Sequence, residues 1–227
     1  MGEPRDLWVF AYGSLMWRPG FGYADAVHAR LVGWGRSFCI YSRYYRGSPR
    51  RPGLVLGLDR GGACEGIAFR IPAPDVAATL HYLREREQVV SVYREALVPL
   101  TLVSTGRPEV KALAFLVERA HPSYAGQMSL ARQAQFIRGA VGRTGSNIDY
   151  LISTLAHLHE LGIRERSLER LLTFVGAHVA RGEALEHARP AAVGLTKRWA
   201  ALPVRTRKRL RPEDARRFSY RSVLGVR

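Results

Sequence analysis

The first half of the chain is patterned like a sheet. Its apolar or alternating runs fall at 8–12, 54–58, 64–71, 97–103 and 110–117. Short runs of this kind, separated by Gly, Pro and Ser, are typical of strands. We therefore expect residues 7–118 to be mostly strand, with a hairpin turn at 104–108. The Tyr-, Arg-, Gly- and Pro-rich stretch 41–53 predicts a long irregular loop, and long loops in compact domains are often functional.

Helical spacing appears once inside this region and dominates after Ser129. The first predicted helix has Asp75 as its N-cap and an apolar stripe along one face. The later helices are expected over about 129–141, after the turn at 145–147 with Gly162 as a stop signal, and from about Ser167. Strands first and helices later predict an α+β fold.

Glu87 occupies an unexpected position in the first helix. Val76, Leu80, Leu83 and Glu87 are separated by four, three and four residues, which keeps them within about 60° on a helix. Glu87 thus falls on the buried stripe, whereas Glu85 should face solvent. A buried carboxylate is paired, metal-bound or held with a raised pKa for acid–base work. A salt bridge to an arginine and a helix that ends early are the open alternatives.

The segment Tyr12-Gly13-Ser14-Leu15-Met16 directly follows the first strand. Glycine lets the backbone turn sharply or approach a ligand. Successive amides in such a turn can bind a carboxylate or an oxyanion. The alternative is an ordinary break after a strand. Ser14 is not expected to be a covalent nucleophile, because the Gly-x-Ser-x-Gly elbow is missing.

Charge separates a body from a tail. Of the formal net charge of +16, residues 190–227 carry +9, from eleven Lys/Arg and two acidic residues. Apolar periodicity fades there, so we expect a folded domain over 1–188 and a basic extension over 189–227 that is disordered. Binding of nucleic acid or an anionic surface by this extension is a rival function of a different class.

Composition places the chain among globular proteins. Apolar residues make up 47% and charged residues 24% of its 227 residues. The chain has two cysteines without metal spacing, which fits a reduced cytoplasm. It has no apolar run long enough to span a membrane and no secretory pattern after Met1. We therefore expect a cytoplasmic protein without a membrane span. His157 and His159 are two apart, so they do not share a helix face, and we predict no metal site.

Four segments, in order, resemble the ChaC-type glutathione-specific γ-glutamylcyclotransferases. They are the opening from Trp8 to Pro19, Arg46-Gly47 with Arg51-Pro52-Gly53, the run from Tyr82 to Glu87 with Tyr93, and the run from Gly142 to Leu151 with Leu161-Gly162-Ile163. The resemblance covers about residues 8–180. Three features depart from the family pattern: Ser91-Val92 stands where some members have Gly-Gly, Thr144 replaces the common Ser, and the tail has no counterpart.

The resemblance implies a fold, an activity and a site. The fold would be a small mixed barrel carrying the catalytic glutamate on a helix, with C-terminal helices packed on it. The activity would be cofactor-independent cleavage of glutathione to 5-oxoproline and Cys-Gly, with no obligatory protein partner. Glu87 would be the general base and acid, and Tyr12, Gly13, Ser14, Leu15 and Met16 would bind substrate. Arg46, Tyr93 and Tyr150 are further candidate contacts. Other γ-glutamyl amino acids or amines are alternative substrates.

Overall fold

The computed structural model describes three stretches of the chain, and contacts between residues group them into two units. The described stretches are 5–87, 92–103 and 109–176. The first unit holds residues 5–37 and 57–124, and the second holds 38–56 and 125–176. The predicted basic extension and the turn at 104–108 lie outside the described residues.

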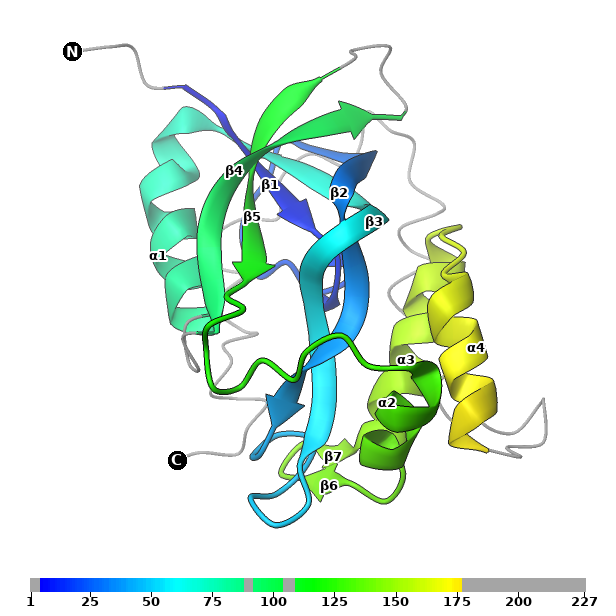
Figure 1. Cartoon of the computed structure of the whole chain (residues 1–227). Helices are drawn as coiled ribbons and strands as arrows, with labels where there is room; N and C mark the ends of the chain where they lie inside the picture. The colour runs from blue at the N-terminus through cyan, green and yellow to red at the C-terminus, as the bar shows by residue number, and fades with distance from the viewer. Residues whose placement is uncertain (1–4, 88–91, 104–108, 177–227) are drawn as a thin grey trace. The chain divides into compact units, whose positions relative to one another are not determined.

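A closed barrel with the strand order β1-β3-β2-β4-β5 forms the first unit (Figure 1). Its strands are β1 (Leu7–Ala11), β2 (Asp25–Ser42), β3 (Gly53–Ile71), β4 (Tyr93–Leu102) and β5 (Val110–Val117), of which β2 and β3 continue into the second unit. The barrel closes where β1 runs parallel to β5, with Trp8 opposite Ala112. Phe10, Phe69 and Phe115 are at most 2% exposed and fill its core.

The predicted pairing of β4 and β5 is confirmed, because β4 pairs antiparallel with β5 from Tyr93 to Leu100. β4 begins at Tyr93, four residues before the apolar run suggested. The predicted loop is also confirmed, since β2 ends at Ser42 and β3 begins at Gly53. A mixed α+β barrel is therefore the observed fold class.

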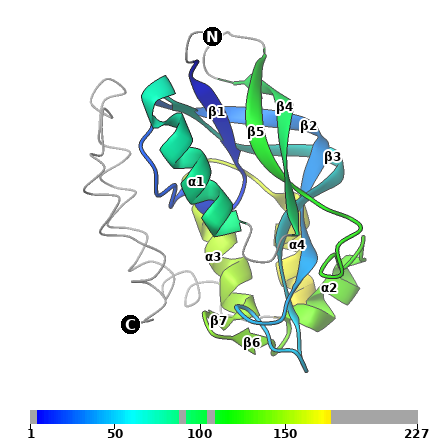
Figure 2. The same ribbon diagram turned by 90° about the vertical axis from the view of Figure 1, so that its left-hand side faces the viewer.

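The helix α1 (Val76–Glu87) lies against the outside of the barrel, as Figures 1 and 2 both show. Leu83 and Thr79 are its buried residues. The Tyr82 ring meets the edge of Phe21 at 6.2 Å between centroids, and Phe21 in turn meets Phe69 of β3 at 5.6 Å. This aromatic contact fixes which face of α1 packs on the barrel.

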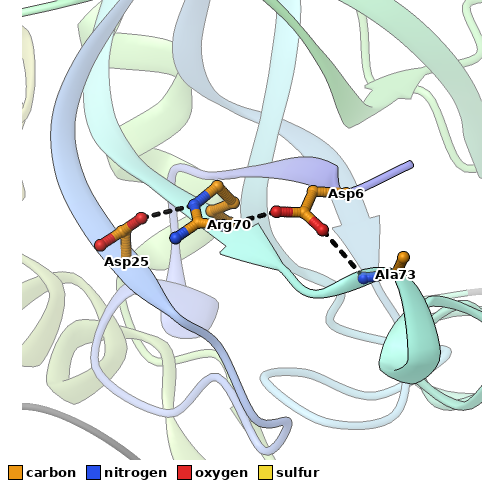
Figure 3. Close-up of polar contacts among 4 residues, drawn as sticks. All are labelled: Asp6, Asp25, Arg70 and Ala73. Atoms are coloured by element: carbon orange, nitrogen blue, oxygen red, sulfur yellow. Dashed lines mark hydrogen bonds and ion pairs between the residues drawn. The ribbon is translucent and has the colours of Figure 1, made fainter. Parts of the chain in front are cut away.

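The start of α1 differs from the sequence prediction. Asp75 is not the N-cap, because it lies inside a 3-10 turn that begins at Ala73. Asp6, far away in the sequence, accepts the hydrogen bond of the Ala73 amide at 3.0 Å. Arg70 lies between Asp6 and Asp25 and donates to both carboxylates, as Figure 3 shows. The Arg70 guanidinium lowers the pKa of Asp6. A long-range carboxylate therefore caps the 3-10 turn that leads directly into α1.

The second unit contains the predicted helices and a short hairpin. They are α2 (Leu130–Ile137), β6 (Val141–Gly142), β7 (Gly145–Ser146), α3 (Asn147–Glu160) and α4 (Arg166–Val175). Ser129 and Ser146 cap α2 and α3 through their side chains. Gly162 adopts the left-handed conformation just after α3, as its predicted stop role requires. The predicted helix over 129–141 is too long, because Val141 pairs with Ser146 in the hairpin.

Candidate functional site

The segment from Tyr12 to Met16 leaves β1 and closes into a 3-10 turn. The Met16 amide donates to the Gly13 carbonyl at 2.9 Å, and the Arg18 amide donates to the Ser14 carbonyl at 2.8 Å. The first amides of a helical turn have no acceptor inside it. A Cβ atom on Gly13 would meet no described atom within 4 Å. No atom of the described residues therefore fills the space beside the backbone at the start of this turn.

Side chains in the segment face two environments. Leu15 and Met16 are each 6% exposed, and Tyr12 is 8% exposed, so all three belong to the core. Gly13 and Ser14 are half-buried. If this segment binds a ligand, its backbone and Ser14 are the groups that can reach it, while Leu15 and Met16 hold the turn in place.

Arg36 fixes the entry to this turn from inside the barrel. Its side chain lies among core residues, with the whole residue 5% exposed. Nε donates to the Tyr12 carbonyl at 2.7 Å, and Nη2 donates to the Glu65 carbonyl at 2.6 Å. Hydrogen bonds from a charged donor are about twice as strong as neutral ones. The Tyr12 carbonyl is therefore held firmly where β1 ends.

Glu87 is the last residue of α1, and its side chain is 17% exposed. As expected, Glu87 is more buried than Glu85, whose side chain is 69% exposed. The buried stripe itself is shifted from the prediction, since Thr79 and Leu83 are buried whereas Val76 and Leu80 are half-buried. Burial raises the pKa of Glu87, and the positive charge of Arg86 opposes that rise. The Arg86 Nε atom lies 3.4 Å from the Glu87 Oε1 atom. The Glu87 carboxyl group therefore keeps its proton to a higher pH than an ordinary glutamate does.

Arg86 joins the end of α1 to the turn after β1. Its Nη2 atom donates to Ser14 Oγ at 2.9 Å, and its Nη1 atom donates to the Arg18 carbonyl at 2.7 Å. Nη1 also donates to the Tyr82 hydroxyl at 2.9 Å, one helical turn earlier. The residue next to Glu87 is therefore bonded directly to the segment predicted to bind substrate.

The remaining predicted contacts fall in different places. Tyr93 is the half-buried first residue of β4, opposite Val117. In the second unit, Arg46 donates to the carbonyls of Thr144 and Ser146 at 2.7 and 3.3 Å. Its guanidinium lies 5.1 Å from the centroid of the Tyr150 ring. Arg46 and Tyr150 are therefore together, and Arg46 holds the turn before α3.

The family follows from a match along most of the described chain. A model of the family described as ChaC-like protein matches residues 7–178. The chain belongs to the ChaC-like family. Among its relatives, the glutathione-specific γ-glutamylcyclotransferase of Escherichia coli is 35% identical over 173 residues, which cover 76% of this chain and 74% of the relative.

The human and yeast relatives extend this comparison. The human glutathione-specific γ-glutamylcyclotransferase 1 is 33% identical over 178 residues, covering 78% of this ChaC-like chain and 80% of the relative. A crystal structure of a yeast γ-glutamyl cyclotransferase specific to glutathione matches with a TM-score of 0.66 at 22% identity, over 76% of this chain and 98% of that one. At that identity, the structural match supports the fold.

The C-terminal signature of this ChaC-like chain has a clear structural role. Asn147 is fully buried, and its side chain accepts from the Leu54 amide at 2.6 Å and donates to the Leu54 carbonyl at 2.7 Å. Thr144, which departs from the family pattern, donates through its hydroxyl to the Tyr45 carbonyl at 2.8 Å. A serine hydroxyl could make the same bond, so this departure is conservative. Ser91 lies outside the described residues.

Arg36 and Arg86 are the positions that the sequence prediction missed. Alternation along β2 does not predict a buried Arg36. The buried positions are odd-numbered as far as Leu31, but Arg36, an even-numbered position, is also buried. Gly33, between them, has a φ of 86°. Arg86 stands one residue from Glu87 and at the margin of the helix stripe, so spacing alone does not distinguish it from a solvated arginine.

His157 and His159, and the helices of the described stretches, bear on metal binding and on membrane insertion. The Nδ1 atom of His157 lies 2.6 Å from the Ser153 carbonyl, whereas Nε2 of His159 lies 3.1 Å from a carboxylate oxygen of Glu169. The two histidines thus have separate partners. Within residues 5–176, gaps excepted, His, Cys, Asp and Glu do not gather in groups of three that could hold a metal. None of the described helices is long and apolar enough to cross a bilayer.

Proposed function

We propose that this ChaC-like protein is a cytoplasmic γ-glutamylcyclotransferase that cleaves glutathione, with Glu87 as its general base and acid. One observation carries the proposal: a buried carboxylate with a raised pKa stands at the end of α1, and its neighbour Arg86 is bonded to the turn at Ser14 and Arg18. The names of the relatives supply the reaction class and the substrate.

The reaction needs no added reactant. The α-amine of the γ-glutamyl group attacks its own γ-carbonyl carbon, and a five-membered lactam closes. The bond from that carbon to the cysteine nitrogen then breaks, which gives 5-oxoproline and Cys-Gly. The attack is intramolecular, so the protein must mainly fold the substrate into the cyclising conformer.

Two protons must move from the α-nitrogen to the leaving nitrogen, and one carboxyl group can relay both. Glu87 takes the first from the α-ammonium group, which frees its electron pair for attack, and gives it to the leaving nitrogen as the carbon–nitrogen bond breaks. The freed carboxylate then takes the second proton from the lactam nitrogen, and the amine of Cys-Gly receives it to become an ammonium group. Such a group works best when its pKa lies near the working pH. The burial that raises the pKa of Glu87 acts in this direction.

The turn after β1 would stabilise the charge that develops during attack. The carbonyl oxygen becomes an oxyanion, and preorganised amides are effective partners for it. The first amides of the 3-10 turn, and the space beside Gly13 that no described atom fills, provide such a place. Tyr93, in the same unit as Glu87, is a further proposed hydrogen-bond donor to the peptide, while Arg46 and Tyr150 of the second unit stay predictions from the sequence.

A direct assay tests the activity and the substrate together. Purified full-length protein is incubated with glutathione and, separately, with γ-glutamyl-alanine, and 5-oxoproline is measured. Glutathione is expected to be the better substrate. Turnover of γ-glutamyl-alanine alone would favour the alternative, a cyclotransferase for other γ-glutamyl amino acids or amines. No 5-oxoproline from either peptide would refute the enzyme assignment.

The basic extension over 189–227 motivates the second candidate function. Its net positive charge would favour phosphate contacts on nucleic acid or an anionic surface. The test compares full-length protein with a chain truncated after residue 188. Loss of nucleic-acid affinity with unchanged 5-oxoproline formation would show that the extension binds separately from the enzyme domain proposed over 1–188.

A further inference from the structure

We infer that Arg86 is a positioning residue that holds the Glu87 carboxylate and the turn at Ser14–Arg18 in one catalytic arrangement. This inference rests on the proposed function, because it assigns Arg86 a part in the chemistry proposed for Glu87. It adds a second residue of α1 to the reaction, and one that acts through its neighbours.

The hydrogen bonds of Arg86 support this role. Its guanidinium contacts Ser14 Oγ, at the start of the 3-10 turn, at 2.9 Å, and the carbonyl of Arg18, two residues past the end of that turn, at 2.7 Å. A third bond, to the Tyr82 hydroxyl at 2.9 Å, ties the same group back to α1. The side chain is only 11% exposed. A buried charge is tolerated when its donors are satisfied, and here Nη1 and Nη2 are bonded to Arg18, Ser14 and Tyr82 while Nε faces the Glu87 carboxylate.

The planar fork explains why an arginine stands here. Arginine presents five donors in a fixed geometry, whereas lysine presents three from one compact point. One lysine ammonium cannot reproduce bonds that leave from separate nitrogens toward Ser14, Arg18 and Tyr82. Arg86→Lys therefore keeps the charge near Glu87 but releases part of the turn.

The charge of Arg86 has a separate effect, on proton affinity. Arg86 is the charged group among the described residues that opposes the rise in the pKa of Glu87 caused by burial. The neighbouring charges on α1 have other partners, since Arg84 is paired with Glu95 of β4 at 2.8 Å and Glu85 lies 3.5 Å from His81. At the turn itself, Arg18 contributes its carbonyl to Arg86. Losing the Arg86 charge should therefore raise the pKa of Glu87 further.

The experiment measures kcat/KM for glutathione against pH in the full-length protein. The variants are Arg86→Met and Arg86→Lys, with Arg84→Met and Arg84→Lys as matched controls on the same helix. An opposite charge within a few ångströms shifts a carboxyl pKa by about 1 to 3 units. Arg86→Met should therefore move the acidic limb up by about one pH unit or more. Arg86→Lys should leave the limb in place while kcat/KM falls at least about tenfold.

The outcomes separate this inference from the proposed function. No turnover by the unsubstituted protein would refute the proposed function itself. An active protein whose Arg86→Lys variant matches Arg84→Lys in kcat/KM would overturn the positioning role. So would an Arg86→Met profile whose acidic limb coincides with that of Arg84→Met. If Arg86→Met does not fold, as judged by circular dichroism, the Arg86→Lys comparison decides.

Discussion

Replacing Asn147 by Leu tests how the signature before α3 stabilises the second unit. Leucine keeps the branched shape of asparagine and is larger, so the change removes the two hydrogen bonds to Leu54 without leaving a cavity. The Leu54 amide then loses its acceptor in a buried position, which costs about 1–3 kcal/mol. The Leu54 carbonyl loses a donor, which costs about 0.5–1.5 kcal/mol more. Together we expect the free energy of unfolding to fall by about 2–4 kcal/mol.

Equilibrium urea unfolding followed by circular dichroism measures this loss. Gln135→Ala is the matched control, because Gln135 carries the same amide group on an exposed position of α2. Exposed substitutions of this kind usually change stability by less than about 0.5 kcal/mol. If Asn147→Leu lost no more than Gln135→Ala, the hydrogen bonds to Leu54 would not stabilise the unit as argued.

Three further predictions concern the first unit. Burial raises the pKa of Glu87, so its ionised form opposes folding. At a pH above the folded pKa, Glu87→Gln should therefore increase the free energy of unfolding measured in urea. The increase should be about 1.4 kcal/mol for each unit by which the pKa is raised. The gain should shrink as the pH falls through the folded pKa and vanish below about pH 4, where the carboxyl is protonated in both states. Asp6→Ala should lower the melting temperature, and Asp6→Asn should lower it by less, since an amide oxygen can still accept from Ala73. In Gly66→Ala the added Cβ would lie 2.2 Å from the Ala11 carbonyl oxygen, so the end of β1 would have to move. The melting temperature and kcat/KM should both fall. Unchanged values would show that the end of β1 tolerates displacement.

Much of the fold could be predicted from local patterns. The hairpin of β4 and β5, the helix α1 and the phase of Glu87 were readable because strand and helix periods are local properties of the sequence. The residue that caps the turn before α1 could not be predicted in this way, because Asp6 lies far from Ala73 in the sequence. The local pattern instead predicted that the adjacent Asp75 is the cap. A side chain from a distant strand can replace a local cap, and no local pattern reports it.

The candidate site was predictable in part for the same reason. The helix phase singled out Glu87 as a buried carboxylate, and resemblance to the family singled out the segment Tyr12–Met16. The group that joins them, Arg86, depends on which way a long side chain turns in three dimensions. Arg36 depends on a change of register along β2. Arg36 donates to the Tyr12 carbonyl just before the turn, and Arg86 donates to Ser14 and Arg18. Such long-range hydrogen bonds produce no periodic pattern in the sequence, so they could not be predicted from it.

The role of Glu87 is tested most directly by 5-oxoproline formation from glutathione in matched variants. Glu87→Gln removes the proton acceptor while keeping the shape of the side chain, and Glu85→Gln makes the same change at an exposed position of α1. The account predicts that Glu87→Gln lowers kcat by about 100-fold or more, while Glu85→Gln retains normal turnover. Turnover that persists undiminished in folded Glu87→Gln would contradict the assignment of Glu87 as the acid–base residue.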